Sequence, residues 1–163
     1  MLFPKPLHLL LYTYHACLLA AQIDLSHNGL CGLTNDFTGR ITGIFNAEGI
    51  KAIASAISTS ASLKEIDLRS NSLCGVRYGQ GTYNADGLKA IAQAISVSAS
   101  LTSIDLTGND FGPEGAQHIA EGISVSASLT SIDLSRNKIG SEGAKHIAKG
   151  IAESASLTQV FAL

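Results

Sequence analysis

Features that mark a disulfide-rich secreted protein or a nucleic-acid-binding protein are missing from this sequence. Its 163 residues include only three cysteines, Cys17, Cys31 and Cys74, and this odd and sparse set argues against a disulfide-stapled scaffold. No Asn-x-Ser/Thr acceptor for glycosylation occurs, which favours an intracellular address. The 11 basic and 13 acidic side chains form no basic block, so we expect no nucleic-acid partner.

The motifs of common enzymes are missing as well. None of His-Glu-x-x-His, Gly-x-Ser-x-Gly and Cys-x-x-Cys occurs in the sequence. Gly79-Gln80-Gly81 has neither the lysine nor the strand-to-helix context of a phosphate-binding loop. We therefore expect a protein without catalytic activity, cofactor or metal.

The sequence does contain an internal repeat. Its last two complete units align without a gap at a spacing of 28 residues, and the two units before them carry inserts of 15 and 10 residues. We predict a single repeat domain over residues 20–163, preceded by a separate apolar segment at residues 1–19. The predicted units are residues 20–62, 63–100, 101–128 and 129–156, followed by the partial unit 157–163.

Each unit has a strand half and a helix half. Ile104 and Leu106 flank Asp105, an alternation that predicts a short strand with one buried face. The second half carries apolar residues at the i, i+3, i+4, i+7 spacing of a one-faced helix. Because no unit can bury both stripes alone, we predict that the units stack and that the stack is the core. One predicted ladder across the stack is Ile23, Ile66, Ile104, Ile132 and Val160.

The pattern LxxIDLxxNxL followed by a helix resembles the ribonuclease-inhibitor-like class of leucine-rich repeats over residues 20–163. Similar arrays occur in NOD-like receptors and in Ran GTPase-activating proteins. The resemblance implies an α/β solenoid, a horseshoe segment with parallel strands on the concave face and helices on the convex face.

The last unit departs from this pattern. Val160-Phe161-Ala162 stands where Ile-Asp-Leu is expected, and no polar closing cap follows. We interpret the chain as a fragment of a longer protein or as the end of a gene model. We expect a monomer, or weak self-association through the uncapped C-terminal strand edge.

Charged side chains recur on the predicted concave face. Because parallel strands lie roughly 4.8 Å apart, the aspartates of successive strands would form a ladder of like charge. One hypothesis is an acidic groove for a basic partner. The alternative is that the aspartates belong to the consensus of the repeat and are satisfied by water and by nearby Ser, Thr and Arg. The candidate residues on this face are Asp24, His27, Glu65, Asp67, Arg69, Asp105, Asp133 and Arg136.

The two inserts, residues 31–46 and 74–84, lie between the Asn turn and the helix of their units, so we predict neighbouring loops on one rim. Both carry the aromatic and arginine side chains that often anchor interfaces. Alternatively, the aromatics cover the helix ends, above all Phe45 and Tyr83. Cys31 and Cys74 share one position of the repeat, and we interpret them as small buried residues, with a redox pair as the alternative. The candidate rim residues are Phe37, Arg40, Arg77, Tyr78 and Tyr83.

Residues 1–19 do not fit the repeat. The segment is apolar with one early lysine, but prolines, histidines and tyrosines interrupt it, so we expect no membrane span. Three interpretations remain open: a helix that covers the first unit, a signal peptide ending near residue 21, and a misassigned leader.

The function predicted from these features is a non-enzymatic protein–protein interaction module of the cytoplasm, whose partner is another protein. A signal peptide would make the protein secreted instead. The alternative functions are regulation of a GTPase, as in the Ran GTPase-activating proteins, and a structural repeat segment of a larger receptor.

Overall fold

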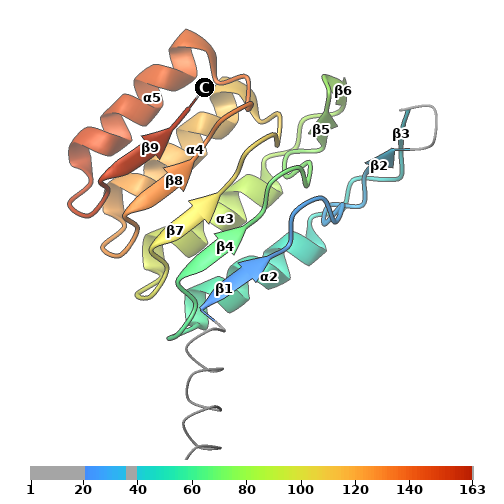
Figure 1. The fold of residues 1–163 in the computed structure, drawn as a ribbon. Coiled ribbons are helices and arrows are strands. Elements are labelled where there is room, and N and C mark those ends of the chain that lie inside the picture. The colour runs from blue at the N-terminus through green and yellow to red at the C-terminus, as the bar shows by residue number, and fades with distance from the viewer. Residues whose placement is uncertain (1–20, 36–39, 163) are drawn as a thin grey trace, which may run out of the picture.

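Strands and helices alternate along the computed structural model, which describes residues 21–35 and 40–162 (Figure 1). Every complete unit contributes one strand to a common sheet and one helix to a common helical layer. The strands of the common sheet are β1 (Gln22–Asp24), β4 (Glu65–Asp67), β7 (Ser103–Asp105), β8 (Ser131–Asp133) and β9 (Gln159–Phe161). The helices are α2 (Glu48–Thr59), α3 (Asp86–Val97), α4 (Gly112–Val125) and α5 (Gly140–Glu153).

The five strands form one parallel sheet in the order β1-β4-β7-β8-β9, so each strand lies beside the strands of the neighbouring units. Pairing is in register from unit to unit: Ile66 lies opposite Ile104, and Ile132 lies opposite Val160. The predicted isoleucine ladder is therefore confirmed. Parallel neighbours follow from the helical crossover, which returns the chain to the same end of the sheet before each new strand.

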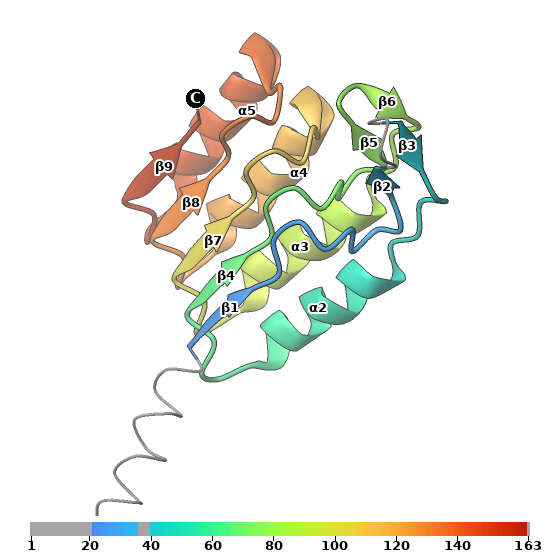
Figure 2. The ribbon, with the colours of Figure 1, turned by 45° about the vertical axis from the view of Figure 1, so that its right-hand side comes forward.

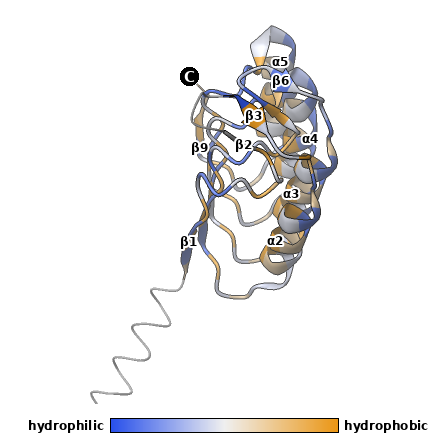
Figure 3. Ribbon diagram, turned by 90° about the vertical axis from the view of Figure 1, so that its right-hand side faces the viewer, coloured by the Kyte–Doolittle hydropathy of each residue, from blue (hydrophilic) through white to orange (hydrophobic). Residues whose placement is uncertain are grey.

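The core lies between the sheet and the helical layer, which Figure 3 shows edge on. Ile104 and Leu106 point into it from β7 and the following turn, and Ile119 and Ile123 point into it from α4; all four are buried. The α/β solenoid that the sequence predicts is confirmed: the helices cover one face of the sheet, and none of the described helices lies on the other face. We call the uncovered face the open sheet face.

Buried asparagines join the turns that follow the strands. Asn109 Oδ1 accepts a hydrogen bond from the backbone N–H of Asn71 at 2.9 Å, and Asn137 Oδ1 accepts one from the N–H of Asn109 at 2.7 Å. Asn109 Nδ2 donates to the carbonyls of Leu68 and Leu106, which belong to two successive units. These bonds satisfy buried backbone groups that no strand or helix pairs.

The two inserts fold into β-hairpins that lie beside each other on one rim (Figure 2). The first rim hairpin, described over residues 31–35 and 40–46, contains β2 (Thr34–Asn35) and β3 (Ile41–Thr42). The second rim hairpin, residues 74–84, contains β5 (Val76–Arg77) and β6 (Gln80–Gly81). Both close in the same way, because the N–H of Asn46 donates to Cys31 and the N–H of Asn84 donates to Cys74. Each of these asparagines then accepts a hydrogen bond from the first N–H of α2 or α3.

The three interpretations of residues 1–19 concern a segment outside the described residues: a helix covering the first unit, a signal peptide and a misassigned leader. Within residues 21–35 and 40–162, none of the helices combines the length and the hydrophobicity that crossing a bilayer requires.

Candidate functional site

The aspartates of the open sheet face end their strands. Asp105 Oδ1 accepts a hydrogen bond from the N–H of Thr107 at 2.8 Å, and Asp133 Oδ1 accepts one from Ser135 at 2.9 Å. Asp24 makes the same bond to Ser26, and this backbone N–H holds the pKa of Asp24 below its usual value. A side chain that bonds the backbone two residues ahead is the ordinary Asx turn. Each of these aspartates therefore stabilises the turn that follows its strand.

Arg69 bridges the aspartates in the middle of the sheet. Its guanidinium pairs with Asp67 and lies 3.7 Å from Asp105 Oδ2. The hydrogen bond to Asp67 raises the pKa of Arg69. Next to this cluster, Gln22 donates a hydrogen bond to Glu65. The charge of the face is therefore mixed, with a basic group set among the carboxylates.

All eight candidate residues of this face line one of two shallow hollows. We call the first, of about 740 Å³, the sheet hollow; the second, of about 430 Å³, lies beside it over β1, β4 and β7. Asp24, Glu65 and Asp67 line only the second, and Asp105 lines both. The sheet hollow is lined by His27, Arg69, Ser70, Asp105, Thr107, Gly108, Asp133, Ser135 and Arg136, which come from four successive units.

The wall of the sheet hollow includes residues in the left-handed region of backbone space. His27, Ser70 and Arg136 have φ of 57°, 56° and 56°, and Gly108 takes the equivalent position with φ of 67°. This conformation costs a non-glycine residue roughly 1–2 kcal/mol. Three of the four units therefore carry a side chain where glycine is intrinsically preferred, and all three side chains line the hollow.

The second rim hairpin adjoins the sheet hollow. Arg77 Nη1 donates a hydrogen bond of 3.4 Å to the carbonyl of Ser70, and the Arg77 guanidinium lies 5.5 Å from the centre of the Tyr78 ring. Tyr78 is 68% exposed. The N–H of Gly79 donates to Asp110, whose other carboxylate oxygen lies 3.1 Å from Lys138 Nζ. The hairpin is therefore bonded to Ser70 of its own unit and to Asp110 of the third unit, with the Tyr78 ring in solvent.

Comparison with known proteins identifies the repeat. A family model described as "Leucine Rich repeat" matches residues 97–120 and 125–148, each of which includes a strand and much of the helix after it. These two stretches are leucine-rich repeats.

Solved structures share the fold of this chain. One is "Leiomodin-1 Actin-Binding Site 2 (ABS2)": its TM-score is 0.64 and its identity 15%, over 99% of this chain and 81% of that chain. Another is the tropomodulin C-terminal domain of Caenorhabditis elegans, with a TM-score of 0.60 and 15% identity over 91% of this chain and 81% of that chain. At these identities the likeness concerns the fold alone. Among curated proteins, none matches the sequence.

The remaining rim candidates differ in their surroundings. Phe37 lies outside the described residues, and Arg40 is exposed just before β3. Tyr83 is partly buried, and burial raises its pKa to about 12. Phe45 packs against the core, and its ring lies against Gly75 of the second rim hairpin. Ile44, which was not among the candidates chosen from the sequence, is strongly exposed on the first rim hairpin.

The two equivalent cysteines are buried and free. Burial raises the pKa of Cys31 to about 12 and raises that of Cys74 as well, so both thiols stay protonated at neutral pH. This fits their interpretation as small core residues. Over residues 21–35 and 40–162, no cluster of three or more His, Cys, Asp or Glu side chains is arranged to hold a metal ion.

Proposed function

We propose that this leucine-rich-repeat protein is a non-enzymatic interaction module, which binds a protein partner through the sheet hollow and the second rim hairpin together. The observation that carries the proposal is the contact between Arg77 and Ser70, because Ser70 lines the hollow and Arg77 belongs to the hairpin. The contact makes the two candidate surfaces one continuous surface.

The composition of this surface suits a protein ligand. Tyr78 offers a large exposed ring stacked near a guanidinium, and such Tyr and Arg side chains contribute strongly to protein interfaces. The hollow beside it is polar and carries both signs of charge, which favours selectivity over indiscriminate adhesion. The actin-binding site of leiomodin-1 is an instance of this fold with a protein ligand.

The charges suggest how such a partner is oriented. The sheet hollow carries Arg69 and Arg136 beside Asp105 and Asp133. The charged side chains of the neighbouring hollow are all acidic: Asp24, Glu65, Asp67 and Asp105. A partner with groups of both signs over the sheet hollow and basic groups over the neighbouring hollow matches this distribution.

We also propose that the repeats belong to the ribonuclease-inhibitor-like class and act in the cytoplasm. A full helix of 12 to 14 residues in every unit supports the first assignment. The free, buried Cys31 and Cys74 support the second, because secreted domains of this size usually pair their cysteines.

The proposal is tested by affinity capture from a lysate of the source cells with the full chain as bait. The test variants are Arg77→Ala with Tyr78→Ala, and Arg69→Ala with Arg136→Ala. The control variant is Lys89→Ala with Gln93→Ala, which changes exposed side chains on the helical layer. We expect each test variant to lose about tenfold or more of a partner that the wild type and the control both retain.

Equal capture by all variants would contradict the proposed surface. The fourfold variant of Arg40, Arg77, Tyr78 and Tyr83 to Ala then decides whether the rim takes part at all. Stimulated GTP hydrolysis across a panel of GTPases, without stable capture, would favour the regulator of a GTPase instead.

A further inference from the structure

We propose that this protein assembles head to tail, the α5–β9 end of one copy docking on the α2–β1 end of a second copy. The proposal concerns other surfaces than the second rim hairpin, and the α5–β9 end shares only Arg136 with the lining of the sheet hollow.

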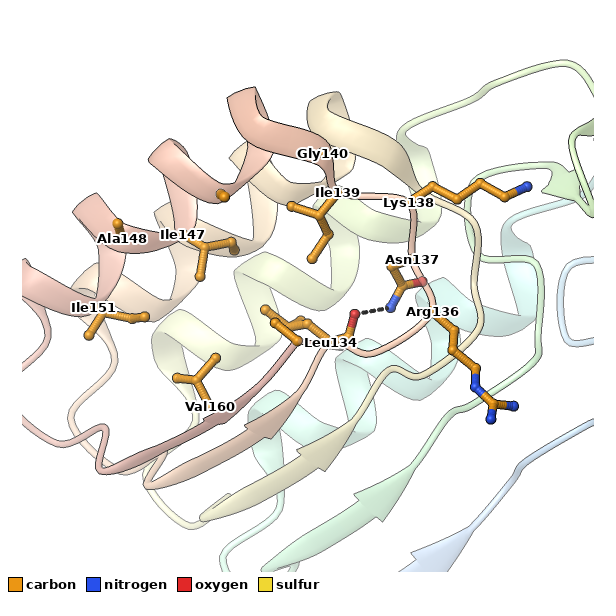
Figure 4. Close-up of a pocket in the computed structure, with 12 residues that line it drawn as sticks. Leu134, Arg136, Asn137, Lys138, Ile139, Gly140, Ile147, Ala148, Ile151 and Val160 are labelled. Carbon is orange, nitrogen blue, oxygen red and sulfur yellow. Dashed lines mark hydrogen bonds between the residues drawn. The ribbon is translucent and has the colours of Figure 1, made fainter.

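The α5–β9 end presents residues that belong to a repeat–repeat interface. Ile151 is 39% exposed, whereas Ile123, at the same position of the preceding unit, is 0% exposed. Ala144 is likewise exposed, whereas its equivalent Ala116 is buried. Together with Ile139, Ile147 and Val160 they line a mostly apolar hollow of about 540 Å³ (Figure 4). The fourth unit therefore retains interface side chains that no described residue covers.

The α2–β1 end shows the complementary pattern. Gly49 and Ala56 are exposed on α2, whereas their equivalents on α3, Gly87 and Ala94, are buried. On the strand, Ile23 is 42% exposed and Ile66 of the next unit is 4% exposed. These are the positions through which later units contact the unit before them.

The contacts inside the array define how the two ends fit. Gly122 of α4 lies against the backbone of Ala92 in α3, and Gly150 of α5 lies against Ala120 in α4 in the same way. Continued by one step, the pattern places Ala56 of the second copy against Ala148 of the first. A small residue at this position lets two helices approach closely, and Ala56 is small. The free edges of β9 and β1 would pair in parallel, extending the sheet.

Charge complementarity supports this register. Within the chain, Lys51 of α2 lies 3.3 Å from Glu48 on its own helix and 3.6 Å from Asp86 on α3. Lys145 of α5 occupies the position of Lys51 and pairs with Glu142 on its own helix at 2.7 Å. In the proposed junction, Glu48 of the second copy takes the place that Asp86 has within the chain. Lys145 would then bridge the two copies as Lys51 bridges α2 and α3.

The two ends differ in structure, so the contact is heterologous and leaves one end of each kind free. Such contacts build open chains of copies unless the rotation closes a ring. We therefore expect the mean mass to grow with protein concentration without stopping at the dimer.

Sedimentation of the full chain over a range of concentrations tests this. The first two variants each block one end with a charge, Ile151→Glu on α5 and Ala56→Glu on α2. Ser55→Glu is the matched control, because Ser55 is the exposed neighbour of Ala56 and its equivalent Gln93 is also exposed. We expect each blocking variant to raise the dissociation constant about tenfold or more, because a buried unpaired charge is costly, and the control to assemble like the wild type. Circular dichroism verifies that all variants remain folded.

Mixing the two blocking variants gives the decisive result. Each still has one intact end of the opposite kind, so the mixture should form a one-to-one dimer and nothing larger. A wild type that stays monomeric at every concentration would overturn the proposal. Loss of assembly in Ile151→Glu alone would overturn it too, because it indicates contact between two α5–β9 ends.

Discussion

At the scale of single residues, buried asparagines link each unit of the repeat to the next. Asn109 joins two successive units: it accepts from Asn71 and donates to Leu68 and Leu106. Asn28 takes the equivalent position in the first unit but is exposed, and its Nδ2 donates within its own turn. Asparagine therefore contributes differently to the free energy of unfolding at the two positions.

Replacing Asn109 by Ala should lower the free energy of unfolding by about 3 kcal/mol, because the buried N–H of Asn71 loses its acceptor. Asn28→Ala should cost less than about 1 kcal/mol, since that side chain is exposed. Urea unfolding of both variants measures the difference. Equal losses would mean that the asparagine bonds carry little of the stability of the array.

Two variants of Arg136 distinguish the effect of backbone strain on stability from the effect of the side chain on binding. Its φ of 56° is unfavourable for any side chain, and Gly108 shows that glycine fits the same turn. Arg136→Gly should therefore be more stable than Arg136→Ala by about 1 kcal/mol. Both variants should weaken partner capture alike, because both remove the guanidinium from the sheet hollow. Thermal unfolding measured beside capture tests this, and a binding loss confined to one variant would contradict it.

At the scale of elements, the second rim hairpin is inserted into a connection between strand and helix that is short in the third unit. In the third unit, Gly112-Pro113-Glu114 alone connects the Asn turn to the body of α4. Replacing residues 74–86 by Gly-Pro-Glu should therefore leave a folded protein with the circular dichroism of the wild type. Partner capture should fall about tenfold or more, because Arg77 and Tyr78 are removed. An unfolded product would show that the hairpin is part of the core rather than an addition.

The spacing of the helices depends on small residues at their contacts. A Cβ at Gly122 would lie 2.6 Å from the carbonyl oxygen of Ala92, so α3 and α4 would have to separate. Gly122→Ala should thus cost about 1–3 kcal/mol, against the gain of about 1 kcal/mol that alanine brings to an unconstrained helix. Ser124→Ala, two residues along the same helix, is the control and should be nearly neutral. A more stable Gly122→Ala variant would mean that α3 and α4 can accommodate a methyl group at this contact without separating.

At the scale of the whole molecule, the periodic part of the structure could be predicted from the sequence. Repetition places Ile66, Ile104 and Ile132 at one position, and stacking leaves only one register that buries all of them. The fold class and the equivalence of Cys31 and Cys74 follow from the same alignment of units.

The contacts of the candidate site could not be predicted in this way. The contact of Arg69 with Asp105 depends on the distance between neighbouring units. The contact of Arg77 with Ser70 depends on the path of a hairpin that does not follow the repeat. The contact between Phe45 of the first insert and Gly75 of the next unit likewise follows from no repeat position. The exposure of Ile151 could not be predicted from the sequence either, because Ile151 occupies the same position of the repeat as the buried Ile123.

The central claim is that one continuous surface, the sheet hollow with the second rim hairpin, binds a protein. Hydrogen exchange of the full chain, with and without the captured partner, tests it most directly. The account predicts slower exchange on binding at residues 69–79, 105–108 and 133–136, and unchanged exchange along the exposed side of α3 and α4. Protection confined to the helices, with none at these turns and the hairpin, would contradict it.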